Sequence, residues 1–248
     1  MFRTIIKMSL ASVAVLGMAS AVQAQSFDYL LLAASWQPGF CANHTTKPEC
    51  RSLRGTYAAS NLALHGLWPN AYDGNHPYYC NVPQKDITLD QSSQWCSMDS
   101  YGISSATLTT LRTYMPGAGP TTSCLDDHEW YKHGSCAQLA SNDFWSEAAT
   151  LMNRLGQTSF NTFLKNSAGR YVTRTQLMNA FEASFGTGSH AAVSFNCTKI
   201  GTKSYLTEVW INLKKTATSS FPAYSSLVTD GAVSSTCPTS NIYVALPQ

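Results

Sequence analysis

The 248-residue sequence lacks a long apolar run and a clear excess of either charge. The apolar stretch at residues 8–18 is much shorter than the roughly 20 residues that a membrane helix needs, and no later stretch is apolar enough. The 16 Lys and Arg residues nearly balance the 14 Asp and Glu residues, whereas a protein that coats a nucleic-acid backbone is usually clearly basic. Any chemistry on nucleic acid must therefore come from a local site.

The cysteines also lack the Cys-x-x-Cys spacing that is typical of structural zinc sites. The N-terminus has the pattern of a secretory signal peptide, with Arg3 and Lys7 beside a short apolar stretch and an A-x-A-like site that ends at Ala24. We expect residues 1–24 to be removed, which leaves a single domain at residues 25–248. In an exported chain, the 8 cysteines predict a set of disulfides.

Local patterns predict helices and strands that do not alternate strictly. Asp126 or Asp127 is expected to cap a helix that begins at His128, and Asn142 or Asp143 to cap the next one. We therefore expect an α+β fold, a single domain with a central, mostly antiparallel β-sheet flanked by helices and held by disulfides. The predicted helices cover 105–114, the segment from 128, 142 or 143 to 155, and 173–185, and the predicted strands cover 27–35, 62–67, 191–197, 205–213 and 242–246.

The segment HEWYKHGSC at residues 128–136 nearly matches the zinc-protease motif His-Glu-x-x-His. That motif needs two histidines four residues apart on a helix. Here Lys132 occupies the position of the second ligand, and His133 follows one residue later. Because a lysine ammonium at that position would repel a metal ion, the spacing argues against a zinc site.

The same segment places its polar groups on one broad face of a helix. At roughly 100° per residue, His128 is paired with Lys132 and Glu129 with His133. Glu129 could orient the imidazole of His133 and raise its basicity, while Lys132 would supply positive charge to a phosphate-type substrate. The alternative is an ordinary charged helix exterior.

Acid–base chemistry on a phosphate needs a second proton-transfer group, and His65 is the candidate. It lies in LALHGLWPN at the end of an apolar run, followed by Gly66, which allows close access, and by Trp68. The alternative is a core histidine that is bonded to the backbone. The remaining histidines, His44, His76 and His190, are expected to be exposed or structural.

Together, three segments resemble the ribonuclease T2 family. HGLWPN at 65–70 and HEWYKHGSC at 128–136 are similar to the two active-site segments of that family, and FDYLLLAASWQPGFC at 27–41 resembles its opening strand and first cysteine. The resemblance implies an endoribonuclease that cleaves single-stranded RNA without a metal or other cofactor. The RNA 2′-hydroxyl would be the nucleophile and a 2′,3′-cyclic phosphate the product, so DNA should resist cleavage.

The resemblance also implies roles for individual residues. His133 matches the general base that acts on the 2′-hydroxyl, and His65 matches the general acid that acts on the leaving 5′-oxygen. Glu129 and Lys132 match positions that stabilise the five-coordinate phosphate, and His128 matches a position that helps to hold phosphate.

Two further positions would contact a base. Trp68 stands where the family stacks a base, and Asn70 stands where a polar residue, frequently aspartate, contacts it. The disulfides implied by the resemblance are Cys80–Cys136, Cys197–Cys237, Cys41–Cys50 and Cys96–Cys124.

These observations together predict a secreted or periplasmic enzyme that is monomeric and has no membrane partner. The alternatives are an inactive binding protein on the same fold and a metal-dependent hydrolase. Because all three catalytic positions are filled, and because the ligand spacing of a zinc motif is broken, the ribonuclease is the preferred interpretation.

Overall fold

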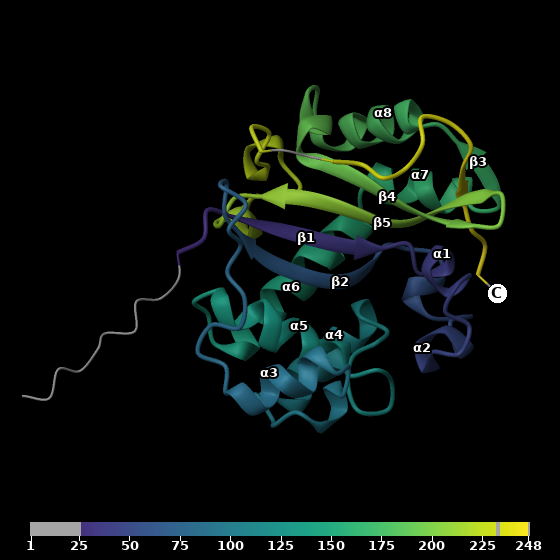
Figure 1. Cartoon of the computed structure of the whole chain (residues 1–248). Coiled ribbons are helices and arrows are strands. Elements are labelled where there is room, and N and C mark those ends of the chain that lie inside the picture. Colours follow the sequence, from purple (N-terminus) through teal and green to yellow (C-terminus); the bar gives the residue numbers. More distant parts are fainter. Residues whose placement is uncertain (1–25, 232–233, 248) are drawn as a thin grey trace, which may run out of the picture.

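A single mixed β-sheet organises the molecule, with helices on one face and beyond one edge (Figure 1). The computed structural model describes residues 26–231 and 234–247, so the predicted signal peptide lies outside the described residues. Six strands occur in this part of the chain: β1 (Tyr29–Ser35), β2 (Ala63–Asn70), β3 (Arg170–Val172), β4 (Val193–Ile200), β5 (Lys203–Leu213) and β6 (Ile242–Val244). Their order is β2-β1-β5-β6-β3, and β4 pairs with β5 off this path. Every pairing is antiparallel except that of β5 with β6, which confirms the predicted α+β fold with a mostly antiparallel sheet.

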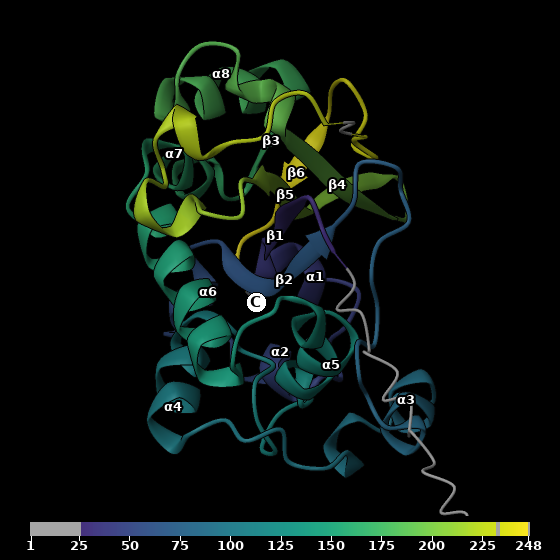
Figure 2. The same ribbon diagram turned by 90° about the vertical axis from the view of Figure 1, so that its left-hand side faces the viewer.

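The helices form two groups. Three of them, α6, α7 and α8, lie on one side of the strands (Figure 2), where Phe144, Phe160, Phe181 and Leu32 meet in the buried core. The others lie beyond the β2 edge or at the start of β5. The bounds are α1 (Gln37–Cys41), α2 (Pro48–Arg51), α3 (Gln84–Gln91), α4 (Ser105–Tyr114), α5 (Leu125–Lys132), α6 (Ser141–Gly156), α7 (Ser159–Ser167) and α8 (Arg174–Phe185). Within the described residues, no helix is both long and apolar enough to cross a bilayer.

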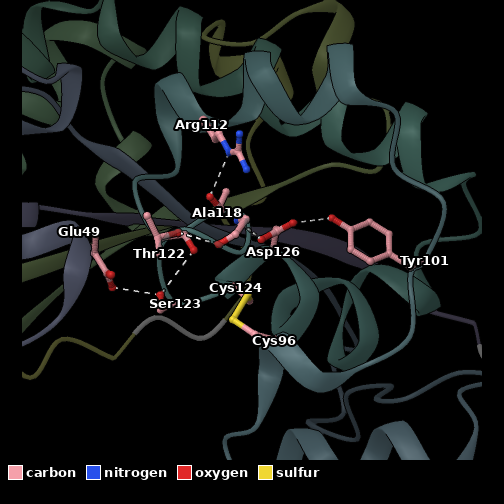
Figure 3. The surroundings of a disulfide bond; sticks show 11 residues. Glu49, Cys96, Tyr101, Arg112, Ala118, Thr122, Ser123, Cys124 and Asp126 are labelled. Atoms are coloured by element: carbon pink, nitrogen blue, oxygen red, sulfur yellow. Dashed lines mark hydrogen bonds between the residues drawn. A yellow bond between two sulfur atoms is a disulfide. The ribbon is translucent and has the colours of Figure 1, made fainter.

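The predicted start of α5 is wrong. The helix begins at Leu125, and neither Asp126 nor Asp127 caps it. The carboxylate of Asp126 instead accepts hydrogen bonds from the backbone N–H of Gly119, at 2.6 Å, and from the hydroxyl of Tyr101, at 2.9 Å (Figure 3). This acid therefore joins the helix to the preceding loop rather than capping its first turn.

Other boundaries also differ from the sequence prediction, among them the start of α6 and the end of β2. No side chain caps α6, which begins at Ser141, because Asn142 Oδ1 accepts a hydrogen bond from the N–H of Ser104 at 2.8 Å instead. Strand β2 continues through Pro69 rather than ending at Leu67. A proline is tolerated there because β2 is an edge strand.

Four disulfides connect the chain, and they are the pairs implied by the resemblance. They are Cys41–Cys50, Cys80–Cys136, Cys96–Cys124 and Cys197–Cys237. Two of them hold the segment around α5. Cys124 precedes the helix in a left-handed conformation, with φ 51°, and Cys136 lies in the short 3₁₀ turn after it.

The approach to α5 is fixed by a further contact. Ser123, next to the disulfide-bonded Cys124, donates its hydroxyl to Glu49 Oε1 at 3.1 Å (Figure 3). Glu49 is a buried residue of α2, so this bond links α5 to the disulfide loop near the N-terminus. The start of the helix is thereby held in place.

Candidate active site

Strand β2 and helix α5 bring the two predicted segments together around Glu129. This carboxylate is 1% exposed. Its Oε1 lies 3.2 Å from His65 Nε2 and 3.6 Å from His128 Nε2, and its Oε2 accepts a 2.6 Å hydrogen bond from Trp68 Nε1. Glu129 is therefore the centre of the site.

Gly66 is what allows the carboxylate to come so close to β2. A Cβ atom at this position would lie 2.0 Å from Glu129 Oε2 and 2.3 Å from Trp68 Nε1. Any larger residue would displace one of these groups. The sequence predicted that this glycine allows a close approach beside His65. The structure shows such an approach, and the group that comes close is the carboxylate of Glu129.

His65 lies between two carboxylates. Its Nε2 faces Glu129, and its Nδ1 lies 2.5 Å from Glu208 Oε1. Burial alone would lower the pKa of His65, but the charges and hydrogen bonds of Glu129 and Glu208 outweigh burial and raise the pKa to about 10. The pKa of Glu129 shows the reciprocal effect, because burial would raise it but the His65 charge outweighs burial and lowers it to about 2. Trp210 Nε1 donates to Glu208 Oε2 at 3.0 Å and holds the second carboxylate in place.

His133 has the opposite electrostatic setting. It lies just after α5, is buried, and its Nδ1 has no hydrogen-bond partner. Burial lowers its pKa to about 4, although Glu129 acts in the other direction. The charge of Glu129 acts to raise the pKa of His133, as predicted, but the predicted direct contact is wrong. The carboxylate turns toward β2, where it forms an ion pair with His65 and accepts the hydrogen bond of Trp68.

Trp68 lies between the two imidazoles. Its ring stacks on His133, with 5.0 Å between centroids, and meets His65 edge-on at 5.4 Å. Tyr78, which is 46% exposed, covers His133 from another side, with 5.3 Å between centroids. Lys132 Nζ lies 5.9 Å above the ring of Tyr78, so the lysine is at the rim of the same site.

His128 is held by groups outside the two predicted segments. Its Nδ1 lies 2.6 Å from Asp90 Oδ1, and its ring stacks on Trp95 with 4.4 Å between centroids. His128 and His133 are 6.5 Å apart, centroid to centroid. Among the residues that the structure describes, no group of three or more His, Cys, Asp or Glu side chains could hold a metal ion.

Two pockets flank this centre. One, of about 290 Å³, is lined by His133, Trp68, Asn70 and Tyr78. Asn70 is buried there and donates to the hydroxyl of Tyr29 at 3.4 Å.

The other pocket, of about 150 Å³, lies on the side of His65. Polar groups and aromatic rings both contribute to its walls. They include His65, Phe40, His44, Trp95 and Glu208.

The other three histidines have different surroundings. His76 Nδ1 accepts the N–H of Ala71 at 3.1 Å, which is the predicted structural role, but His76 also lines the pocket of Trp68 and Asn70. His190 pairs with Glu182 at 2.5 Å away from the site, also as predicted. His44 differs from the prediction because it lines the pocket beside His65.

Comparisons with known proteins agree with this geometry. The model of the Ribonuclease T2 family matches residues 27–223. Ribonuclease I of Escherichia coli (strain K12) is 32% identical over 214 residues, which cover 79% of this chain and 79% of that protein. The chain belongs to the ribonuclease T2 family. It is therefore a T2-type ribonuclease.

Solved structures share the fold of this T2 ribonuclease. The SF11-RNase of Nicotiana alata, associated with gametophytic self-incompatibility, has a TM-score of 0.61 and 19% identity, covering 89% of this chain and 100% of its own. RNase NT, crystallised in complex with 5′-AMP, has a TM-score of 0.61 and 18% identity, covering 88% and 98%. At these identities the likeness concerns the fold alone.

Three residues of this T2 ribonuclease site were missed by sequence reasoning. Glu208 holds His65, whereas Asp90 and Trp95 hold His128. A charged residue in the middle of the predicted strand 205–213 was a usable signal for Glu208. Asp90 and Trp95 gave none, because their segment has no apolar periodicity and no motif.

Proposed function

We propose that the chain is a secreted or periplasmic endoribonuclease that cleaves single-stranded RNA by acid–base transesterification without a metal. The main support is that two imidazoles, His65 and His133, are held in opposite protonation states on either side of Trp68. Pairs of titratable groups whose pKa values are pushed apart are typical of acid–base sites. We further propose removal of residues 1–24, a catalytic domain at 25–248, and a monomeric enzyme.

His133 is the base and His65 the acid in this mechanism. The neutral imidazole of His133, with its low pKa, takes the proton from the 2′-hydroxyl as O2′ attacks phosphorus. The bond from phosphorus to O5′ breaks, and the imidazolium of His65 gives its proton to O5′. The products are a 2′,3′-cyclic phosphate and a free 5′-hydroxyl. No water or metal is needed in this step, because the RNA supplies the nucleophile.

The geometry gives Glu129 a different part from the one that the resemblance implies. With its pKa lowered to about 2, the carboxylate is negatively charged and would repel the developing charge on phosphate. It instead keeps His65 protonated. It also holds Trp68 by a hydrogen bond, and Trp68 in turn fixes the positions of the two imidazoles relative to each other. The positive charge of Lys132 and the imidazole of His128 are left to contact phosphate oxygens.

The two pockets match the two nucleotides at the scissile bond. The pocket of Trp68 and Asn70 contains His133, so it would hold the nucleotide that carries the attacking 2′-hydroxyl. The pocket beside His65 would hold the leaving nucleotide. Stacking on aromatic rings recognises single-stranded bases without a basic surface, which agrees with the balanced charge of the chain. RNase NT binds a nucleotide, 5′-AMP, in its crystal structure, and this supports RNA as the substrate class.

The test is cleavage by the purified mature protein in excess chelator. We expect RNA fragments that end in 2′,3′-cyclic phosphate and no cleavage of a DNA strand of the same sequence. An inert protein would support a binding protein instead. Cleavage that chelator abolishes and zinc restores would support a metal-dependent hydrolase.

Two variants test the residue roles. His65→Ala and His133→Ala should each nearly abolish cleavage while circular dichroism shows an intact fold. His190→Ala is the matched control, because His190 pairs with Glu182 away from the site, and it should cleave normally. Near-normal turnover in either of the first two variants would refute the assignment.

A further inference from the structure

Three tyrosines lie in a row across the end of the sheet where β5 begins. Tyr205 is the register partner of Tyr243 across β5 and β6, and Tyr243 is the partner of Tyr171 across β6 and β3. Neighbouring ring centroids are 5.2 Å and 5.1 Å apart. Tyr171 is 51% exposed, and the other two are half-buried. We call these three residues the tyrosine row.

The tyrosine row is on the same face of the sheet as the active site. Leu206 and Val209 both lie in the buried core, because a β-bulge between them shifts the alternation of β5. Tyr205 and Glu208 therefore share the opposite face. Thr198, the register partner of Tyr205, lines a pocket together with Glu208, which supports this placement.

Two pockets that share residues extend from the active centre toward the row. The pocket that contains Thr198 also contains Phe40, His44 and Glu208, and the same three residues line the pocket beside His65. At about 3.3 Å per residue along a strand, Tyr205 lies roughly 10 Å from Glu208. Helix α1, which carries Phe40, packs beside this end of β5 (Figure 1).

The segments that form this end of the sheet carry charge of one sign, although the whole chain is nearly balanced. Lys203 Nζ lies 4.9 Å above the ring of Tyr243. No Asp or Glu occurs in the three segments that form this end of the sheet, 163–175, 197–205 and 237–247. The charged residues of these segments are Lys165, Arg170, Arg174, Lys199 and Lys203. Lys203 lies against the row, whereas Arg170 and Lys199 are each one residue away from a position on the face of the row and so belong to the other face.

We propose that the tyrosine row is a second binding site for single-stranded RNA, which holds substrate nucleotides beyond the two at the scissile bond. Aromatic rings beside basic groups are what single strands stack on, and stacking tolerates any base. The pockets that lead toward the row start beside His65, which faces the leaving nucleotide. The row would therefore bind the part of the RNA that follows the leaving nucleotide. The inference rests on the proposed function, since it makes the row a further binding site for the RNA that the active site would cleave.

The same contacts have a purely structural explanation, which the experiment must separate. Cross-strand aromatic pairs stabilise a sheet, and Tyr171–Tyr243 is such a pair. A structural role predicts a lower thermal midpoint in alanine variants with no effect that depends on RNA length. A binding role predicts an effect on long RNA that is absent from a dinucleotide.

The binding assay uses a fluorescent 2′-O-methyl RNA of ten nucleotides, which the enzyme cannot cleave because the 2′-hydroxyl is blocked, and a dinucleotide of the same chemistry. Wild type should bind the longer ligand more tightly. Tyr171→Ala should weaken that binding about fivefold or more and leave dinucleotide binding unchanged. Tyr171→Phe should retain the tighter binding of the long ligand, since the phenyl ring remains.

Lys203→Ala should reduce the dependence of binding on salt. Tyr224→Ala is the control, because Tyr224 is a comparably exposed tyrosine, 45%, outside the row.

The outcomes distinguish this inference from the proposed function. Equal affinity of wild type for the long and short ligands, or an undiminished preference for the long ligand in Tyr171→Ala and Lys203→Ala, would overturn the second site. Loss of long-ligand preference in Tyr224→Ala to the same extent would also overturn it. Cleavage of a dinucleotide substrate is measured separately, and its absence in wild type would overturn the proposed function rather than the binding result.

Discussion

Removing the charge of Glu129 should move the pKa of His65 more than any other single change in the site. Glu129→Gln keeps the shape of the side chain and an oxygen that can accept the Trp68 Nε1 hydrogen bond. It removes the charge that contributes most to raising the pKa of His65. The variant therefore isolates electrostatics from packing.

The size of the effect follows from the geometry. A rise of the His65 pKa from 6.5 to about 10 corresponds to roughly 5 kcal/mol in favour of the imidazolium. An opposite charge within hydrogen-bonding distance moves a pKa by about 1 to 3 pH units. Since burial lowers the pKa of His65 and only Glu208 would remain to raise it, we expect a fall of that order in Glu129→Gln.

The protonation states that His65 and His133 need for catalysis determine how activity changes with pH. His65 must be protonated to act as an acid, so activity is lost as the pH rises through its pKa. The alkaline limb of kcat/KM should therefore lie well above pH 6.5 in wild type and move toward neutral in Glu129→Gln. His133 must be neutral, so activity should also fall as the pH drops through about 4. Loss of the negative charge beside His133 should lower that acid limb further, not raise it.

Two measurements check this prediction. The pH dependence of kcat/KM with a dinucleotide reports the free enzyme, and NMR titration of the histidine Cε1–H signals reports His65 directly. Glu208→Gln is the matched control and should move the same pKa less, because Glu208 contributes less to it. A His65 pKa near 6.5 in wild type, or one unchanged by Glu129→Gln, would refute the electrostatic argument.

Three further changes have expected outcomes. Gly66→Ala should lower kcat about a hundredfold with the fold retained, because the new Cβ would lie 2.0 Å from Glu129 Oε2 and misplace the carboxylate; near-normal kcat would contradict this. Trp68→Phe keeps an aromatic ring, although a smaller one, but loses the donor to Glu129, so thermal unfolding should show a loss of about 1–3 kcal/mol; an unchanged midpoint would contradict this. Cys80→Ser with Cys136→Ser opens a link of sequence separation 56, worth about 4 kcal/mol in the chain-entropy model; an unchanged denaturant midpoint would exclude that value.

Local sequence signals predicted much of the framework. Helix α4 has the predicted bounds, and Thr173 forms a capping box with Gln176 at the start of α8. Strands β1, β2, β4, β5 and β6 were predicted to within a few residues because apolar patterning is a local property, whereas the three-residue β3 was not predicted. Their ends were less predictable, since β2 passes through Pro69 only because no further strand pairs with its outer edge.

The structure brings residues of both predicted segments together, but it does not pair them as predicted, and it adds Glu208, Asp90 and Trp95. Sequence spacing along one helix favoured a contact between Glu129 and His133, whereas the carboxylate bonds His65 from another element. Glu208 reaches the same imidazole from 143 residues away in the chain. Such contacts depend on strand order and register, which no local pattern specifies. The partners of His65 could therefore be identified only from the folded structure.

The disulfides at both ends of α5 have a consequence for where the enzyme can work. Cys124 before the helix and Cys136 after it fasten the segment that carries Glu129 and His133. Both links form only where thiols are oxidised. In a reducing environment, packing alone would hold the catalytic segment. We therefore expect the reduced chain to cleave RNA more slowly than the chain with its disulfides formed. In a cell that makes this nuclease, reducing conditions would by themselves delay the formation of a fully fastened catalytic segment.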